Sequence, residues 1–258
     1  MPGSDLDLLT NAAREAGEIA LRYWKRSPEF WEKEDGTGPV TVADLAVNDM
    51  LVSELRRARP DYGWLSEETP DSSERMTARR CFIIDPIDGT RAFMDGTPDF
   101  AHSLAIAEDG KVTAAVVYLP AQNRLYSAST AASATQNGVP LKVTAAASVD
   151  GASVLTARPN LAPEHWRGGV PPPVRRVFRS SLAWRLALVA EGAFDGMLTL
   201  RPTWEWDVAA GALIVERAGG RVSDRAGRSL RFNSRDPRVG GCVAAAPAVH
   251  EGLLAALK

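Results

Sequence analysis

The chain has 258 residues, of which 45% are hydrophobic and 24% charged, and its formal net charge is −2. These values are typical of a globular protein with one large or two ordinary domains, and a core of that size needs no disulfide to hold it. The slight negative charge argues against nucleic acid as the main partner, and no apolar run approaches the ~20 residues of a membrane span.

Two helices are predicted at the start of the chain, over 5–25 and from residue 42 to a stop at Pro60. Each is preceded by a capping box, in which a hydroxyl and a carboxylate three residues apart satisfy free backbone groups. The boxes are Ser4 with Asp7 and Thr41 with Asp44. The polar segment 27–39 between the helices contains glycine and proline, so we expect a loop there.

The stretch from Cys81 to Thr90 organises the rest of the chain. Its apolar beginning, 81–84, predicts a buried strand that leads to Asp85. Pro86 cannot donate to a strand ladder, so we expect the strand to end there. Asp88 follows three residues after Asp85, and two carboxylates this close repel each other unless a cation lies between them. An acidic surface turn is the alternative that this stretch alone leaves open.

A series of hairpins follows, with strands expected at 103–107, 112–119, 124–128 and 139–143. Turn residues separate them, among them Asn137 and Gly138. The series predicts an antiparallel sheet packed on the first two helices. We therefore interpret residues 1–145 as an N-terminal α+β domain that carries most of the acidic positions.

Strands and helices alternate in the second half. Strands are expected at 153–157, 175–178, 194–200 and 241–246, and helices at 182–191, 208–218 and 249–257. This alternation predicts a mixed sheet with helices on its faces. Residues 146–258 are interpreted as a C-terminal α/β domain, and the fold class as α/β (α+β). Cys81 and Cys242 lie in apolar runs and are expected to be buried thiols of a cytoplasmic protein.

Several acidic residues begin or end a predicted element, which is where binding side chains are commonly placed. They are Asp44, Glu67, Asp85, Asp88 and Asp207. Carboxylates and backbone carbonyls are the ligands of hard cations such as Mg²⁺. The histidines are scattered without zinc spacing, and no P-loop or serine-nucleophile motif is present. A helix-capping role for Asp44 and a solvated loop around Glu67 are the structural alternatives.

Four motifs in order carry a family resemblance: 33–44 with Lys33 and Asp44, 64–68, 85–90, and 205–211. Together they resemble the inositol monophosphatase superfamily of magnesium-dependent, lithium-sensitive phosphatases. The resemblance spans nearly the whole chain and implies a five-layer αβαβα sandwich. It also implies a hydrolase that removes phosphate from a small metabolite by direct attack of water.

The resemblance assigns roles to particular residues. Glu67, Asp85 and the carbonyl of Ile87 would hold one Mg²⁺; Asp85, Asp88 and Asp207 would hold a second; and a third, looser ion would lie beside Glu67. Thr90 and Asp44 would position and deprotonate the attacking water, with Glu67 also counted as catalytic. Cations between these carboxylates would reverse the local field, which a phosphate dianion otherwise avoids.

Within the superfamily, 180–182, 188–192 and 201–207 resemble the 3'(2'),5'-bisphosphate nucleotidase branch, which converts adenosine 3',5'-bisphosphate to AMP. The expected substrate contacts are Asp88, Gly89, Thr90, Ser180, Ser181 and Glu205. Arg179 and Arg201 are candidates to meet a second phosphate, and surface arginines of an arginine-rich chain are the alternative. Inositol-1-monophosphatase is an alternative, and so is histidinol-phosphatase, which Arg91-Ala92-Phe93 resembles.

The partners expected from this interpretation are a small phosphorylated metabolite and Mg²⁺, without nucleic acid or membrane. A homodimer is left open. Two functions of other classes are considered beside catalysis, namely a non-catalytic binding role and a role in association with RNA. The complete set of carboxylates argues against the first, and the net charge of −2 with no basic and aromatic stripe argues against the second.

Overall fold

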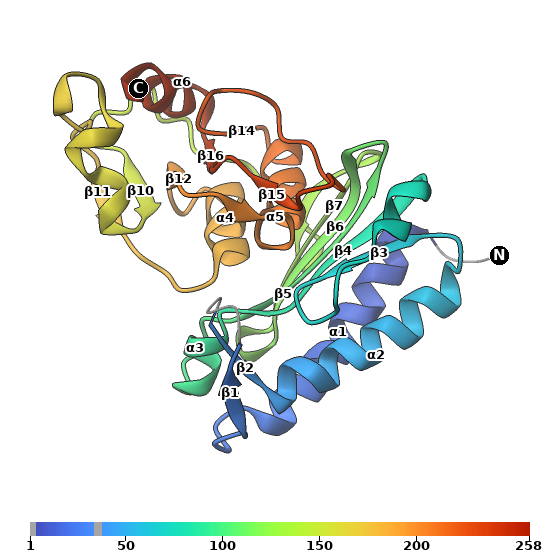
Figure 1. Ribbon diagram of the computed structural model, residues 1–258. Coiled ribbons are helices and arrows are strands. Elements are labelled where there is room, and N and C mark those ends of the chain that lie inside the picture. Colours follow the sequence, from blue (N-terminus) through green and yellow to red (C-terminus); the bar gives the residue numbers. More distant parts are fainter. Residues whose placement is uncertain (1–3, 34–37) are drawn as a thin grey trace.

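The computed structural model describes residues 4–33 and 38–258. It confirms the αβαβα sandwich (Figure 1): α1 and α2 cover one face of a seven-stranded sheet, α4 and α5 lie between that sheet and a five-stranded sheet, and α6 covers the far side. The helices are α1 Asp5–Tyr23, α2 Val42–Ala58, α3 Thr90–Met94, α4 Leu182–Ala190, α5 Glu205–Arg217 and α6 Pro247–Ala256.

Both predicted capping boxes are present at the starts of α1 and α2. The segment 27–39 is not only a loop, because β1 (Phe30–Glu32) pairs antiparallel with β2 (Pro39–Thr41). Residues 34–37 of that predicted loop lie outside the described residues. The ribbon brings Lys33 at its end towards the acidic residues that follow β3 (Gly63–Ser66).

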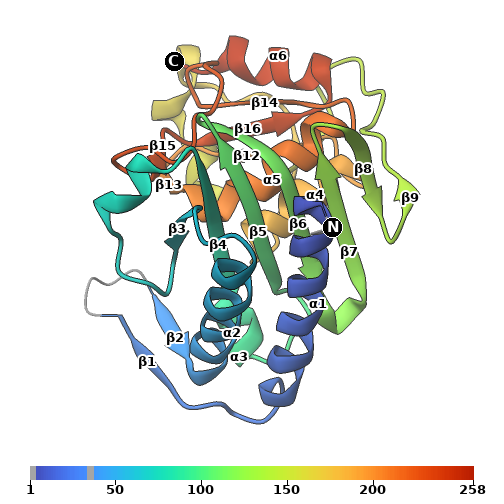
Figure 2. The same cartoon turned by 90° about the vertical axis from the view of Figure 1, so that its right-hand side faces the viewer.

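The seven-stranded sheet has the order β3-β4-β5-β6-β7-β8-β9, with β3 and β4 parallel and the other neighbours antiparallel. The added strands are β4 Arg80–Asp88, β5 Ala101–Glu108, β6 Lys111–Leu119, β7 Arg124–Ser129, β8 Ala132–Gln136 and β9 Val139–Pro140. Figure 2 shows α1 and α2 in front of this sheet. Alternate side chains of β4 reach opposite cores: Phe82 packs in the cluster under α1 and α2, and Ile83 in the cluster around α5.

Strand β4 does not end at Pro86, as the sequence predicted, but continues to Asp88. Its register with β5 shifts between the pairs Asp85–Ser103 and Asp88–Ala101, so that Pro86 and Ile87 lie opposite His102 alone. This is a β-bulge, a place where proline is tolerated because a ladder N–H is not required.

The five-stranded sheet has the order β11-β10-β12-β16-β14 and is mixed, as predicted. Its strands are β10 Ser153–Thr156, β11 Arg175–Val177, β12 Gly196–Thr199, β14 Arg221–Ser223 and β16 Cys242–Ala245, and a separate pair is formed by β13 Thr203–Trp204 and β15 Arg238–Val239. Helix α5 begins at Glu205, three residues earlier than predicted, which places Asp207 in its first turn.

The larger hydrophobic cluster contains residues from both halves of the chain, such as Ile83 and Leu213. The division into domains at residue 145 remains a prediction. Both cysteines are free and buried, as expected. Among the described residues, none of the helices has the length and apolar character needed to cross a membrane.

Candidate active site

Three carboxylates from two distant parts of the chain, the end of β4 and the start of α5, lie close together. Asp85, Asp88 and Asp207 each offer an oxygen, and these oxygens lie within 4.8 Å of one another. No lysine or arginine in the part of the chain that the structure describes forms an ion pair with any of the three. The group therefore concentrates negative charge without a direct ion pair among the described residues, although the charges of Arg185 and Arg201 act on Asp88 and Asp207.

Asp85 is 1% exposed, and its Oδ1 has no hydrogen-bond partner among the described residues. Burial raises its pKa well above the usual range, and the charges of Glu67, Asp88 and Asp207 raise it further. A buried carboxylate oxygen that lacks a partner is costly, so a site that keeps one beside other acids has the character of a cation site.

The bulge in β4 explains how Asp85 and Asp88 serve one site. In a regular strand, residues three apart point to opposite faces, whereas the additional residue of a bulge changes that alternation. His102 lies opposite the bulge, and its Nδ1 is 2.5 Å from the carbonyl oxygen of Pro86. Burial lowers the pKa of His102 to about 4, so at neutral pH it is uncharged and donates this hydrogen bond as Nδ1–H.

Asp88 is held by the start of α4. Its Oδ2 accepts hydrogen bonds from the Ser181 hydroxyl and from the Ala183 backbone N–H, each at 2.6 Å. Burial raises the pKa of Asp88 to about 6, although these hydrogen bonds lower it. Ser181 is fully buried and caps α4. The structure thus corrects its expected role: it holds Asp88 rather than presenting its hydroxyl to a substrate.

Asp207 is positioned by the first turn of α5. The Ser103 hydroxyl on β5 donates to the Trp206 carbonyl at 2.9 Å, which ties the start of α5 to the strand beside Asp85. Burial raises the pKa of Asp207 well above its usual range, Asp88 and Glu67 raise it further, and Arg201 lowers it. Strand β5, which pairs with β4, therefore also helps to position Asp207.

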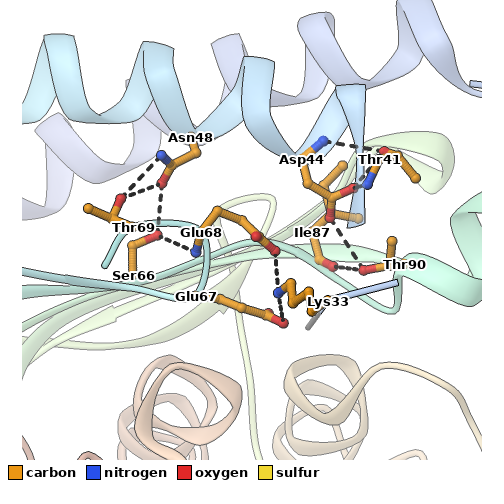
Figure 3. A network of polar contacts seen from close by, with 10 residues as sticks. All are labelled: Lys33, Thr41, Asp44, Asn48, Ser66, Glu67, Glu68, Thr69, Ile87 and Thr90. Atoms are coloured by element: carbon orange, nitrogen blue, oxygen red, sulfur yellow. Dashed lines mark hydrogen bonds and ion pairs between the residues drawn. The ribbon is translucent and has the colours of Figure 1, made fainter. Parts of the chain in front are cut away.

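A second polar group joins residues of β2, α2, β4 and α3 (Figure 3). The Thr90 hydroxyl is 3.3 Å from Asp44 Oδ1 and 3.2 Å from the Ile87 carbonyl oxygen. Asp44 Oδ2 accepts from the backbone and hydroxyl of Thr41, as the capping box requires. Burial raises the pKa of Asp44 to about 6, against the lowering effect of Thr41. Asp44 therefore caps α2 with one oxygen and faces Thr90 with the other.

Lys33 lies between Glu67 and Glu68, with its Nζ 2.8 Å from an oxygen of each (Figure 3). Burial lowers the pKa of Lys33, but these two carboxylates hold it above its usual range. Burial and the charge of Glu67 raise the pKa of Glu68 to about 7. Glu67 is outside the closest group of three acids, yet its charge acts on both Asp85 and Asp207.

A cleft of about 640 Å³ opens beside Asp88 and Asp207. Ser180 lines this cleft and is exposed, and its role as a substrate contact stays a prediction. Glu205 does not reach it: this fully buried side chain accepts hydrogen bonds from the backbone N–H groups of Asn233 and Ser234, at 2.6 and 3.0 Å. The sequence placed Glu205 beside Asp207, but the helical turn between them sends the two side chains to different partners.

Of the two arginines expected to meet a second phosphate, Arg201 lines the cleft and Arg179 does not. Arg179 donates to the Phe178 carbonyl and lies over the Trp184 ring. Sequence reasoning missed His102 and Arg185, a buried arginine on α4 that also lines the cleft. In the sequence, His102 and Arg185 are each only a polar residue within an apolar run. Such a pattern does not show which residue the side chain contacts.

These residues fit a divalent cation such as Mg²⁺. The donor set consists of carboxylates with the carbonyl of Ile87 nearby, which suits a hard cation. The unpartnered Oδ1 of Asp85 is an available ligand atom. Asp88 uses Oδ2 for the α4 contacts, which leaves Oδ1 for a cation.

Comparison with known proteins gives a consistent match. A family model described as the inositol monophosphatase family matches residues 4–258. An inositol-1-monophosphatase of Mesorhizobium japonicum is 32% identical, with 98% of this chain and 96% of that protein covered. Nus factor SuhB of Escherichia coli is 31% identical over 98% and 95% of the two chains. The solved structure of an IMPase from Thermotoga maritima is 30% identical, with a TM-score of 0.82 and coverage of 97% and 95%.

Proposed function

Because the chain belongs to the inositol monophosphatase family, whose members are phosphatases, we propose that it is a Mg²⁺-dependent phosphomonoesterase of a small phosphorylated metabolite. The observation that carries this proposal is the group of Asp85, Asp88 and Asp207, with their oxygens within 4.8 Å and one of them buried without a partner. When bound, divalent cations would neutralise these carboxylates, attract the phosphate and activate water.

Asp44 and Thr90 are suited to handle the proton of the attacking water. The Thr90 hydroxyl is within 3.3 Å of Asp44 Oδ1, so it can accept a proton from water while passing its own to Asp44. Burial raises the pKa of Asp44 to about 6, close to the range in which a general base works at neutral pH. No protein nucleophile is required for an in-line displacement by water.

Gly89 shapes the place where the phosphate would lie. Its φ is +99°, and a Cβ at this position would be 2.9 Å from the Asp99 carbonyl oxygen. A side chain would therefore be strained here and would displace neighbouring backbone. The backbone therefore requires glycine at this position, and the N–H groups of Gly89 and Thr90, where α3 begins, are proposed to face the phosphate.

The relatives make inositol 1-phosphate the reference substrate, because the Mesorhizobium japonicum protein is named an inositol-1-monophosphatase. This alternative has better support than the bisphosphate nucleotidase that the sequence favoured. Adenosine 3',5'-bisphosphate stays as a second candidate, because Arg201 lines the cleft beside Asp207. Histidinol phosphate is a third, supported by Arg91 in the same cleft.

Phosphate release from these three substrates tests the proposal, with Mg²⁺, with EDTA and with Li⁺ added to Mg²⁺. We expect hydrolysis of at least one substrate to need Mg²⁺, to disappear with EDTA and to return when Mg²⁺ is restored. Inhibition by Li⁺ would support the likeness to the family's lithium-sensitive members. Undiminished hydrolysis in EDTA would contradict the metal-dependent mechanism.

A further inference from the structure

A short turn after β3 carries Glu67 and Glu68. It is formed by residues 66–69 and is closed by a hydrogen bond of 3.4 Å from the Thr69 N–H to the Ser66 carbonyl. The first and the last residue of the turn each carry a hydroxyl, and the two glutamates lie between them. The groups that hold these hydroxyls therefore set the backbone position from which both carboxylates project.

Asn48 on α2 holds both hydroxyl groups (Figure 3). Its Oδ1 accepts from the Ser66 hydroxyl at 2.8 Å, and its Nδ2 donates to the Thr69 oxygen at 3.2 Å. The Trp64 indole N–H donates to the same Thr69 oxygen, also at 3.2 Å. Asn48 is 5% exposed and Ser66 2% exposed, so these contacts are sheltered from water. A side-chain amide offers an acceptor and donors together, and the two ends of this turn use both.

Helix α2 also carries Asp44, one turn before Asn48. The two residues are four apart, so their side chains lie on the same face of the helix, and both are buried. Asp44 faces Thr90, whereas Asn48 faces the turn 66–69. Burial raises the pKa of Asp44 most, and the charge of Glu67 raises it further, so the two carboxylates interact. One helix therefore places the proposed general base and the turn of Glu67 with respect to each other.

The other side of the turn is tied to β4. The Glu67 N–H donates to the Ile84 carbonyl at 3.2 Å, directly before Asp85 in the chain. This bond continues the parallel pairing of β3 with β4 by one residue. Burial raises the pKa of Asp85 most, and the charge of Glu67 is the next largest cause. The distance of Glu67 from Asp85 and Asp44 therefore depends on β4 and on Asn48.

We propose that Asn48 is a positioning residue of the active site, which holds Glu67 where it can share a cation with Asp85. Asn48 acts through the turn 66–69 and touches neither substrate nor cation. This inference rests on the proposed metal-dependent phosphatase function and adds a residue that lies outside the four motifs. A role in packing α2 against the sheet, without effect on cations, is the outcome against which it is tested.

A double-mutant cycle on Mn²⁺ binding tests this role, with free Mn²⁺ measured by electron paramagnetic resonance in the absence of substrate. Glu67→Gln identifies the binding step that depends on Glu67, because it raises the Kd of that step. Asn48→Ala should raise the same Kd by about tenfold, as removal of a group that orients a ligand does. In the double variant the Kd should be no higher than in Glu67→Gln alone, because Asn48 acts only through Glu67.

Asn48→Asp separates the loss of the contacts from the change of residue. Its two oxygens can accept from the Ser66 and Thr69 hydroxyls, since Thr69 Oγ1 already lies 3.3 Å from Asn48 Oδ1. We expect its Mn²⁺ Kd to stay within about threefold of the wild type. Ser153→Ala is the matched control, because it removes a buried hydroxyl that contacts a carboxylate, Asp195, and neither residue lines the cleft. It should lower the melting temperature and leave the Mn²⁺ Kd unchanged.

Two results would overturn the role of Asn48. In the first, Asn48→Ala loses as much stability as Ser153→Ala and binds Mn²⁺ like the wild type, which limits Asn48 to packing. In the second, the losses of Asn48→Ala and Glu67→Gln add up in the double variant, which places the action of Asn48 elsewhere. If Asn48→Ala does not fold, Thr69→Val takes its place, since it removes one of the two contacts and should raise the Kd by about threefold.

Failure of the phosphatase proposal has a different signature. Absence of Mg²⁺-dependent hydrolysis of every substrate would contradict the phosphatase function, whereas the Mn²⁺ cycle would still decide the role of Asn48, because it needs no turnover. A wild-type protein that binds no Mn²⁺ would overturn the cation site and the role of Asn48 together.

Discussion

Two buried acidic regions of this protein differ in how their oxygens are satisfied. In the first, Asp85 keeps an unpartnered oxygen beside Asp88 and Asp207. In the second, Glu205 is equally buried, but its two oxygens accept from the backbone N–H groups of Asn233 and Ser234. Both regions lie at the junction of the seven-stranded sheet with the C-terminal half.

The second region is completed by Arg75 in the short helix Ser73–Thr77. This arginine is 3% exposed, pairs with Asp71, and donates to the Asn233 side chain and the Ser234 carbonyl. Glu205 and Arg75 thus hold the same two residues of one loop, Asn233 and Ser234. A buried carboxylate that keeps a free oxygen among like charges therefore indicates a ligand site, whereas one whose two oxygens both accept hydrogen bonds indicates a structural contact.

Asp85→Asn should have the largest effect on activity. We expect kcat/KM to fall by about a thousandfold or more, because the variant removes charge from the proposed cation site. The melting temperature of the EDTA-treated protein should be unchanged or higher, since the mutation relieves repulsion among buried carboxylates. Asp236→Asn, at an exposed ion pair, is the control. Near-normal turnover in Asp85→Asn would contradict the proposed cation site and its contrast with the structural role of Glu205.

Acid should destabilise the fold through His102. Its pKa is about 4 when folded and 6.5 when unfolded, so its contribution to stability is complete above pH 6.5 and is lost as the pH falls towards 4. The loss amounts to at most about 3 kcal/mol. Urea unfolding at several pH values in EDTA should therefore show that the free energy of unfolding falls less at acid pH in His102→Val than in the wild type. Parallel pH profiles for the two proteins would contradict the assignment.

Glu205→Gln should lower the free energy of unfolding by about 1–3 kcal/mol, because an amide nitrogen would face a backbone N–H that the carboxylate now accepts. Arg75→Leu should also lower the free energy of unfolding, because it removes the hydrogen bonds from Arg75 to Asn233 and Ser234. Chemical denaturation measures both. Turnover with Mg²⁺ should change by less than about tenfold in Glu205→Gln, in contrast with Asp85→Asn. A loss of activity as large as that of Asp85→Asn would place Glu205 in the site after all.

His102→Val should also weaken cation binding modestly. The side chain supports the carbonyl of Pro86 inside the bulge that directs Asp85 and Asp88 to one side. Loss of this support should raise the Kd for Mn²⁺ by about threefold, less than removal of a direct partner of a ligand would. Electron paramagnetic resonance measures free Mn²⁺ without turnover, and His250→Gln, at a buried histidine bonded to Ser223, is the control. An unchanged Kd would limit His102 to a role in stability.

Most of the helices and strands, and the acidic residues of the candidate site, could be predicted from the sequence alone. The capping boxes of α1 and α2 depend on residues three apart, and the strands depend on local runs of apolar side chains. The order of the acidic motifs was enough to indicate the family. Such signals are readable because each depends on neighbours within one or two turns of the chain.

Which side chains face the candidate site became clear from the three-dimensional arrangement of the chain. The bulge at Pro86 brings Asp85 and Asp88 to one side, whereas the motif alone ended the strand before it. The Ser181 hydroxyl donates to Asp88, and Glu205 accepts from a loop that follows nearly thirty residues later. Arg185 became part of the cleft wall. The direction of a side chain depends on partners far along the chain, and the local pattern of residues does not contain them.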